Sequence, residues 1–157
     1  MKNNEYSSDS IEVLEGLDAV RLRPGMYIGD SSSKGLHHIL WEIVDNSIDE
    51  IANGYGDRVD IELLSDGSVS VTDNGRGIPV DIHKELKIPA LEIVFTKLHS
   101  GAKFGSDDYK FSGGLHGVGS AVTNAVSRWL NATVWRNGSE NYIEFHSPEI
   151  NGKIKSG

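Results

Sequence analysis

The chain has 157 residues, no cysteine and a formal net charge of −8. This length corresponds to one domain, and 38% hydrophobic residues are enough for a buried core. The charge argues against an extensive nucleic-acid surface, because phosphate binding needs clustered Lys and Arg, and the lack of cysteine excludes disulfides and thiolate metal sites. No apolar run is long enough to span a bilayer and the start lacks the features of a signal peptide, so we expect a cytoplasmic protein that makes no membrane contact.

The first half of the chain is predicted to begin with an arm and two helices. Residues 1–10 are polar and are expected to be ordered only when something holds them. Residues 11–22 are compatible with a short helix that Arg23-Pro24-Gly25 ends. The clearest predicted helix runs from 35 to 53, because apolar residues recur there at spacings of three and four and Asn53-Gly54 follows.

After this helix the apolar period changes to two. Residues 59–64 and 68–72 alternate around Ser65-Asp66-Gly67 and predict a β-hairpin. Further helices are predicted at 91–98 and 120–129, and a second hairpin at 132–136 and 141–146 across Asn137-Gly138. Trp41, Trp129 and Trp135 are expected to pack in the core or at an edge. The pattern indicates an α/β class with two layers, in which helices cover one face of a sheet.

Residues 112–120 contain four glycines in nine positions and lead directly into a predicted helix. Such a loop can wrap polyphosphate, because glycine lets the backbone approach closely and the helix adds the positive end of its dipole. Glycine-rich turns before helices also arise for packing or capping, so the loop alone leaves both interpretations open. The preceding residues 101–114 have a length that is typical of lids, binding loops or disorder.

Polar side chains follow one face of the helix predicted at 35–53. Glu42, Asn46 and Asp49 stand at i, i+4 and i+7 and therefore share a face. Such a stripe is commonly solvated surface. The functional alternative is that the carboxylate activates a water molecule while the neutral amide one turn away coordinates Mg²⁺.

A third motif, Asp73-Asn74-Gly75-Arg76-Gly77-Ile78-Pro79, follows directly on a predicted strand. An Asp-Asn-Gly run is first a turn signal. The additional Gly77 and Pro79 indicate an exposed backbone with a fixed exit direction. A buried Asp73 at this point can accept a hydrogen bond from an exocyclic amine such as that of adenine, and Gly77 removes a side chain that would block the ring.

Together the three motifs resemble the Bergerat-type ATP-binding site of the GHKL family, which includes type IIA topoisomerases, MutL, the large ATP-dependent heat-shock chaperone and histidine kinases. The resemblance implies a mixed β-sheet with helices on one face, and ATP and Mg²⁺ as cofactors. The segments VRLRPGMYIG (20–29) and YKFSGGLHGVG (109–119) narrow it to the ATPase subunits of bacterial gyrase and topoisomerase IV. WEIVDNSIDE (41–50) favours the topoisomerase IV subunit ParE slightly over gyrase B, and a clamp of the MutL or chaperone type is the alternative.

The resemblance also implies roles for individual residues. Glu42 is the general base that polarises the attacking water, His38 helps to orient that water, Asn46 holds Mg²⁺, and Asp73 accepts the adenine amine. Arg76 is expected to pair with Glu50. The ATP-binding residues implied in addition to Asn46 and Asp73 are Tyr6 of the partner copy's arm, Arg76, Gly77, Ile78, Pro79, Lys103, Tyr109, Gly114, Leu115, His116, Gly117, Val118, Gly119 and Ser120.

The family pattern extends beyond residue 157. Residues 11–157 are therefore expected to form a GHKL ATP-binding domain that is incomplete at its C-terminus and that binds ATP with little turnover. The implied partners are a second copy that the N-terminal arm reaches, ATP-competitive small-molecule inhibitors, and, for the full-length bacterial protein only, DNA and a DNA-cleaving subunit of the ParC or GyrA type. In that protein, ATP binding and hydrolysis are expected to drive dimer-gate closure and DNA strand passage.

Overall fold

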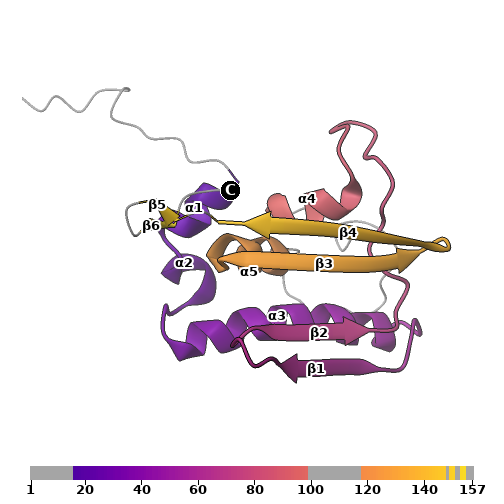
Figure 1. The fold of residues 1–157 in the computed structure, drawn as a ribbon, viewed down its shortest axis with the longest axis horizontal. Coiled ribbons are helices and arrows are strands. Elements are labelled where there is room, and N and C mark those ends of the chain that lie inside the picture. The colour runs from indigo at the N-terminus through magenta and orange to yellow at the C-terminus, as the bar shows by residue number, and fades with distance from the viewer. Residues whose placement is uncertain (1–15, 99–117, 148, 151–152, 155–157) are drawn as a thin grey trace, which may run out of the picture.

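A computed structural model describes residues 16–98 and 118–147 and the backbone of two short strands that follow them (Figure 1). The elements in chain order are α1 (Leu17–Leu22), α2 (Gly25–Ile28), α3 (Ser33–Ala52), β1 (Val59–Leu63), β2 (Val69–Asp73), α4 (Ala90–Thr96), α5 (Gly119–Val126), β3 (Trp129–Arg136), β4 (Ser139–His146), β5 (Glu149–Ile150) and β6 (Lys153–Ile154). Strands β1 to β4 form one layer, and α3, α4 and α5 lie behind it in Figure 1, as the predicted two-layer arrangement requires. Among the described residues, no helix combines the length and the apolar character that crossing a membrane demands.

Helix α3 matches its prediction within two residues at each end. Its first turn is capped by Ser32, whose Oγ accepts the backbone N–H of Lys34 at 3.3 Å. At its end the N–H of Asn53 donates to the carbonyl of Asp49 at 3.1 Å. At position 35, in the first turn of α3, only glycine fits, because a Cβ there would lie 1.8 Å from the carbonyl oxygen of Asp30. The preceding loop therefore packs tightly on the first turn of α3.

The segment before α3 differs from its prediction. Helix α1 ends at Leu22 before Arg23-Pro24, as expected, but Pro24 then becomes the N-cap of α2, which was not predicted. Proline suits a helix start because its missing N–H has no partner there in any case. Residues 11–15 of the predicted helix lie outside the described residues.

Both predicted hairpins are confirmed. β1 pairs with β2 from Val59↔Asp73 to Leu63↔Val69, and β3 pairs with β4 from Trp129↔His146 to Arg136↔Ser139. Asn137 and Gly138 both have positive φ (54° and 76°), as a two-residue hairpin turn requires. All strand pairs in the described part of the chain are antiparallel, which differs from the predicted mixed sheet. The reason is local: each pair is joined by a connection too short for the crossover that parallel strands need.

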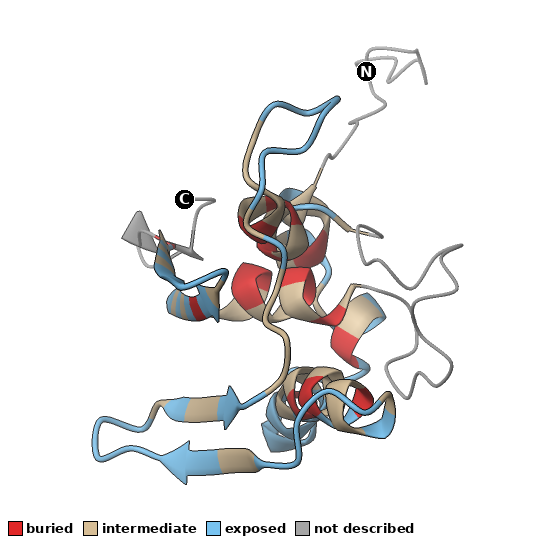
Figure 2. Ribbon diagram, turned by 90° about the vertical axis from the view of Figure 1, so that its right-hand side faces the viewer, coloured by how far each residue is buried: buried red, intermediate tan, exposed pale blue. Residues whose placement is uncertain are grey.

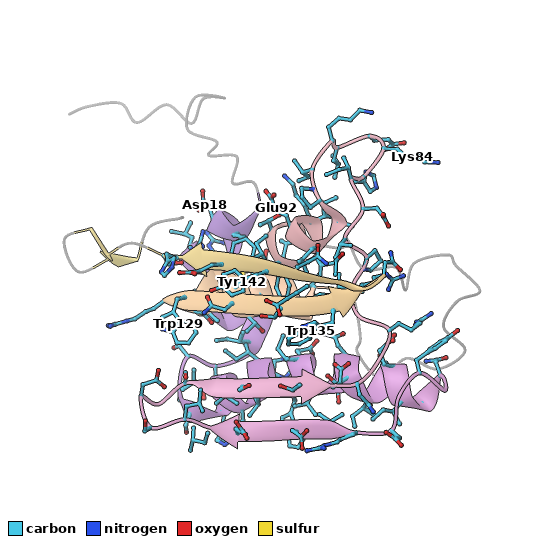
Figure 3. The ribbon with its side chains drawn as sticks, turned by 45° about the vertical axis from the view of Figure 1, so that its right-hand side comes forward. Asp18, Lys84, Glu92, Trp129, Trp135 and Tyr142 are labelled. Carbon is cyan, nitrogen blue, oxygen red and sulfur yellow. The ribbon has the colours of Figure 1, made fainter. Side chains whose placement is uncertain are left out.

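The helix predicted at 120–129 was too long, and the structure assigns its last residues differently. Helix α5 ends at Val126, where the Ser127 hydroxyl donates to the carbonyl of Thr123 at 2.6 Å. Trp129 then begins β3, whose side chains alternate between the helical layer and solvent. Trp129 and Trp135 take the outward positions and are 44% and 64% exposed, and Trp41 is 59% exposed, so of the two predicted positions, core or edge, the core is excluded for all three. Figure 3 shows Trp129 and Trp135 towards the two ends of β3, with Tyr142 on β4.

The buried residues lie mainly in the helices (Figure 2). Helix α5 is central, since it contacts α1, α3 and α4. Its small buried residues Ala121 and Ala125 allow these close approaches, and the buried Asn124 amide donates to the carbonyl of Phe95 at 2.8 Å. A second cluster joins Leu91 and Phe95 of α4 to the inward side chains of β3 and β4. The core therefore fixes where α5 begins relative to α3.

Candidate functional site

The polar face of α3 meets the first turn of α5. The Glu42 side chain lies against Gly119, where a Cβ would be 2.5 Å from Glu42 Oε2. One turn further along α3, the Asn46 side chain donates to Ser120 Oγ at 3.3 Å. Residues from two motifs far apart in the sequence are thus adjacent, and the glycine is required for this contact.

Glu42 also has a histidine beside it on the same helix. His38 Nε2 and Glu42 Oε1 are 3.8 Å apart, at a spacing of one helical turn. The His38 side chain is 52% exposed and the Glu42 side chain 21%. The structure therefore brings together the two predicted catalytic side chains, with the carboxylate more sheltered than the imidazole.

Asp49, the third member of the predicted stripe, has a different environment. It is only 3% exposed, and its backbone carbonyl accepts the Asn53 side-chain amide at 2.7 Å as well as the N–H of Asn53. Asp49 is therefore part of the interior near the end of α3. Glu42 and Asn46 are the members of the stripe that reach α5.

Asp73 ends β2 and is held by two donors. The Ser47 hydroxyl donates to Asp73 Oδ2 at 2.7 Å, and the backbone N–H of Gly75 donates to Oδ1 at 2.9 Å. Ser47 lies on α3 directly after Asn46 and is 4% exposed, whereas Asp73 is exposed rather than buried as predicted. Sequence reasoning missed Ser47, although a serine in the apolar stripe of a helix is a signal that its hydroxyl has a partner.

Arg76 makes the predicted pair with Glu50 of α3. Its Nη2 lies 2.8 Å from Glu50 Oε1 and its Nε 3.1 Å from Oε2, a bidentate arrangement that also includes the Arg76 backbone N–H. The guanidinium stacks on the Tyr55 ring, with Cζ 3.5 Å from the ring centroid. Tyr55 was not singled out from the sequence, because nothing local links it to Arg76.

The segment that follows β2 packs against β3. Gly77 has φ of 76°, and a Cβ there would lie 2.8 Å from Val134 Cγ1, so its absence of a side chain serves packing on β3. Arg136 of β3 donates from Nη1 to the carbonyls of Gly77 and Arg76. Beyond them, Ile78 packs in the second core cluster and Pro79 is exposed. Arg136 is thus a further residue that shapes this segment and that sequence reasoning missed.

Seven predicted ATP-binding residues lie outside the described residues: Tyr6, Lys103, Tyr109, Gly114, Leu115, His116 and Gly117. Val118, Gly119 and Ser120 are described, and they form the N-cap and first two residues of α5. Within the described ranges no three His, Cys, Asp or Glu side chains gather as a metal site. The Asn46 side-chain oxygen beside the Glu42 carboxylate nevertheless fits Mg²⁺, which takes few protein oxygen ligands and completes its shell with water and substrate phosphates.

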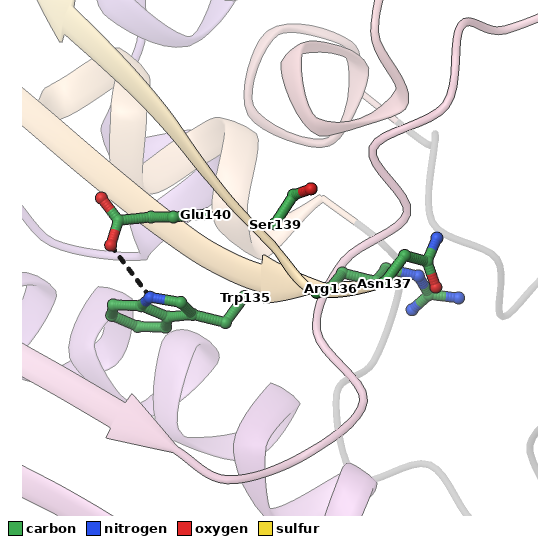
Figure 4. A pocket seen from close by; sticks show the side chains of 6 residues that line it. Trp135, Arg136, Asn137, Ser139 and Glu140 are labelled. Carbon is green, nitrogen blue, oxygen red and sulfur yellow. Dashed lines mark hydrogen bonds between the residues drawn. The ribbon is translucent and has the colours of Figure 1, made fainter.

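A surface hollow lies elsewhere, at the turn between β3 and β4 (Figure 4). It is lined by Trp135, Arg136, Asn137, Gly138, Ser139 and Glu140, and the Trp135 indole N–H donates to Glu140 Oε2 at 3.0 Å across it. Of these residues, Arg136 also donates to the carbonyls of Arg76 and Gly77 in the segment after β2. Because the hollow is built from a single hairpin turn, we assign it no ligand.

Comparison with known proteins places this geometry in a family. Residues 31–151 match the family model described as histidine kinase-, DNA gyrase B-, and HSP90-like ATPase. The B subunit of DNA topoisomerase 4 from Staphylococcus aureus, strains Mu50 and N315, is 55% identical over 159 aligned positions, which cover 99% of this chain and 24% of each relative. The chain thus spans about a quarter of the length of these relatives.

A solved structure shows the same likeness in three dimensions. The 43K ATPase domain of Thermus thermophilus gyrase B, determined in complex with an aminocoumarin, superposes with a TM-score of 0.72 and 40% identity over 88% of this chain and 34% of that one. The elements that carry the candidate site, α3 and α5, thus belong to a chain that resembles this ATPase domain in fold as well as in sequence. The chain therefore belongs to the histidine kinase-, DNA gyrase B-, and HSP90-like ATPase family.

Proposed function

We propose that this chain is the ATP-binding and ATP-hydrolysing part of a type IIA DNA topoisomerase subunit of the topoisomerase IV ParE or gyrase B kind. One observation carries the proposal: the Glu42 and Asn46 side chains meet the N-terminus of α5, while Asp73 is hydrogen-bonded to the same helix, α3. Three groups are thus arranged along α3: the Glu42 carboxylate that can activate water, the Asn46 amide that can bind a metal, and the Asp73 carboxylate that can accept a base amine. The similarity to the B subunit of DNA topoisomerase 4 supports the reaction class.

The phosphate end of the site is the start of α5. Backbone N–H groups of the first helical turn have no partner within the helix, and the helix dipole places partial positive charge there. Gly119 and Ser120 therefore suit the β- and γ-phosphates, together with the preceding predicted residues 114–118. Phosphoryl transfer depends mostly on positioning and charge neutralisation, and a rigid helix start held on α3 supplies both.

Glu42 acts as the general base in this proposal. Its carboxylate borders the start of α5 and is partly sheltered, so it can accept a proton from a water molecule aimed at the γ-phosphate. His38, at 3.8 Å, orients that water. Asn46 holds Mg²⁺ by its side-chain oxygen, and bound Mg²⁺ supplies the positive charge that phosphate oxygens require.

The base end of the site is Asp73. Because Ser47 and Gly75 hold its carboxylate, Asp73 presents fixed acceptor positions to an adenine amine. Arg76, Gly77, Ile78 and Pro79 border the same end of the pocket. The lid residues Lys103 and Tyr109 and the partner's Tyr6 complete the proposal, with residues 1–10 as an arm and 11–157 as the ATP-binding domain.

For the longer protein we propose ATP-driven dimer closure and strand passage in the bacterial cytoplasm, with DNA and a ParC or GyrA type partner. The curated relatives supporting this are bacterial. ATP-competitive inhibitors are expected ligands, since the gyrase B neighbour holds an aminocoumarin. The alternative, a clamp of the MutL or chaperone type, shares the pocket but has no reason for its ATPase to be stimulated by duplex DNA.

A chimera tests the proposal. This chain replaces its matching segment in the B subunit of Staphylococcus aureus DNA topoisomerase 4, and the chimera is assayed with the DNA-cleaving partner for ATP-dependent decatenation and DNA-stimulated ATPase. We expect both activities, and we expect Glu42→Gln in the chimera to abolish them while nucleotide binding persists. A folded chimera that binds ATP but shows neither activity would count against the topoisomerase assignment.

A further inference from the structure

We infer that Ser47 is a positioning residue that sets the purine preference of Asp73: its hydroxyl makes the site favour a base with an exocyclic amine over one with a carbonyl at the same position. The inference rests on the proposed nucleotide-binding function and deepens it. It assigns a part of the base specificity, which the family resemblance gives to Asp73, to a buried residue of α3.

The hydrogen bonds around Asp73 carry the inference. Oδ2 accepts the Ser47 hydroxyl at 2.7 Å and Oδ1 accepts the Gly75 N–H at 2.9 Å. An ionised carboxylate has about four acceptor sites. Each oxygen therefore keeps capacity for a further donor, and the two internal bonds fix the direction in which that capacity points.

The setting of the two residues explains why the hydroxyl matters. Asp73 is exposed, so packing does not by itself hold its carboxylate. Ser47 is 4% exposed and belongs to a helix whose position is set by the core, so it is a rigid anchor. The other carboxylate oxygen, Oδ1, faces Gly75, whose backbone is so close that a Cβ on residue 75 would lie 2.9 Å from it. Without the hydroxyl, the Gly75 N–H is the one remaining hydrogen-bond donor to the carboxylate within the described part of the chain.

Two nucleotides with different bases distinguish a role of Ser47 in positioning Asp73 from a purely structural role. Adenine presents an amine that donates to a held carboxylate, whereas hypoxanthine presents a carbonyl oxygen that repels it. Loss of pre-organisation therefore weakens only the ligand that uses the carboxylate. A purely structural role for Ser47 would weaken both ligands equally.

The experiment is a thermodynamic cycle in which the Ser47 hydroxyl is removed from the protein and the exocyclic amine is removed from the nucleotide, separately and together. The β,γ-imido analogues of ATP and ITP, each with Mg²⁺, are titrated calorimetrically into the unmodified chain and into Ser47→Ala. Ser70→Ala is the matched control, because Ser70 lies on the opposite face of β2 from Asp73. Ser47→Cys retains a donor at this position, weaker than the hydroxyl and on a somewhat larger side chain, and gives a second measurement if Ser47→Ala does not fold, as judged by its thermal midpoint.

We expect Ser47→Ala to weaken binding of the ATP analogue about three- to tenfold, the range for one net hydrogen bond, and to change binding of the ITP analogue less than about twofold. Ser47→Cys should fall between, and Ser70→Ala should match the unmodified chain. Equal weakening of both nucleotides, or no change in either, would overturn the inference while leaving the proposed function intact. If the unmodified chain bound neither nucleotide, the proposed function would fail as well.

Discussion

Glu42 packs directly on Gly119: a Cβ at residue 119 would lie 2.5 Å from Glu42 Oε2 and 2.7 Å from Glu42 Cβ. This contact sets the distance between the proposed general base and the helix start that is proposed to hold the phosphates. The glycine is therefore a geometric requirement of the site, independent of any role in loop flexibility.

Gly119→Ala tests that contact. The added methyl must displace either Glu42 or α5, so we expect a loss of about 1–3 kcal/mol in the free energy of unfolding and weaker nucleotide binding. Gly25→Ala is the matched control, because its Cβ would meet nothing within 4 Å and its φ is not positive. Chemical denaturation and calorimetric titration measure the two effects. A Gly119→Ala protein with unchanged stability and affinity would contradict the packing argument.

Tyr55 is predicted to stabilise the fold through Arg76. The guanidinium lies 3.5 Å from the ring centroid and is held at its edge by Glu50. Replacing the ring by Tyr55→Leu should reduce the free energy of unfolding by about 0.5–1 kcal/mol, whereas Tyr55→Phe retains the ring and should be close to neutral. Denaturant titration of the two variants measures the difference, and equal stability of both would show that the stacking contributes nothing.

A side chain at Gly77 would cause both backbone strain and a clash with β3, whereas a side chain at Gly67 would cause backbone strain alone. Gly77→Ala forces a positive φ on alanine and places its methyl 2.8 Å from Val134 Cγ1, so we expect a loss of about 2–4 kcal/mol. Gly67→Ala has the φ penalty alone, because its surroundings are open, and should cost about 1 kcal/mol. Thermal unfolding of both variants checks the order. Equal losses would mean that the contact with β3 is unimportant.

The turn between β1 and β2 gives a pH prediction. Hydrogen bonds from the Ser68 hydroxyl and then from the Ser68 backbone N–H lower the pKa of Asp66 below its ordinary value. A carboxyl whose pKa is lower in the folded state stabilises the fold above its unfolded pKa, about 3.9, and this contribution is lost as the pH falls through the folded pKa.

Asp66→Ala should therefore lower the thermal midpoint at pH 7, and the difference from the unmodified chain should shrink below about pH 4. Melting curves between pH 2.5 and pH 7 measure it. A difference that stays constant over this range would show that the ionised carboxylate does not contribute.

Local patterns predicted the elements well where one period dominates a segment. Helix α3 followed from its three- and four-residue spacing, and the turn at Asn137-Gly138 followed from the Asn-Gly pair itself, whose two residues both adopt positive φ in the structure. At Trp129 the prediction failed because an apolar helix runs into a strand without a strong turn signal between them. Residues 129–131 are recognised as the start of β3 only once their pairing with residues 144–146 of β4 is known.

Contacts between distant segments were predictable only where a motif pointed to them. The Arg76–Glu50 pair was expected and is confirmed. Ser47 and Arg136 were missed, because their hydrogen bonds to Asp73 and Gly77 depend on how α3 and β3 pack around the end of β2. The packing reason for Gly77 was missed on the same ground, since a sequence does not show that β3 lies beside it.

Nucleotide binding by the 157-residue chain tests the central claim most directly. The unmodified protein and Asp73→Asn are titrated with the β,γ-imido analogue of ATP and Mg²⁺ in a calorimeter. We predict saturable binding with one nucleotide per chain, weakened at least about tenfold in a folded Asp73→Asn protein, because the held carboxylate is the acceptor for the base amine. An unmodified, folded chain that gives no binding heat, and whose thermal midpoint does not rise with the nucleotide, would contradict the account.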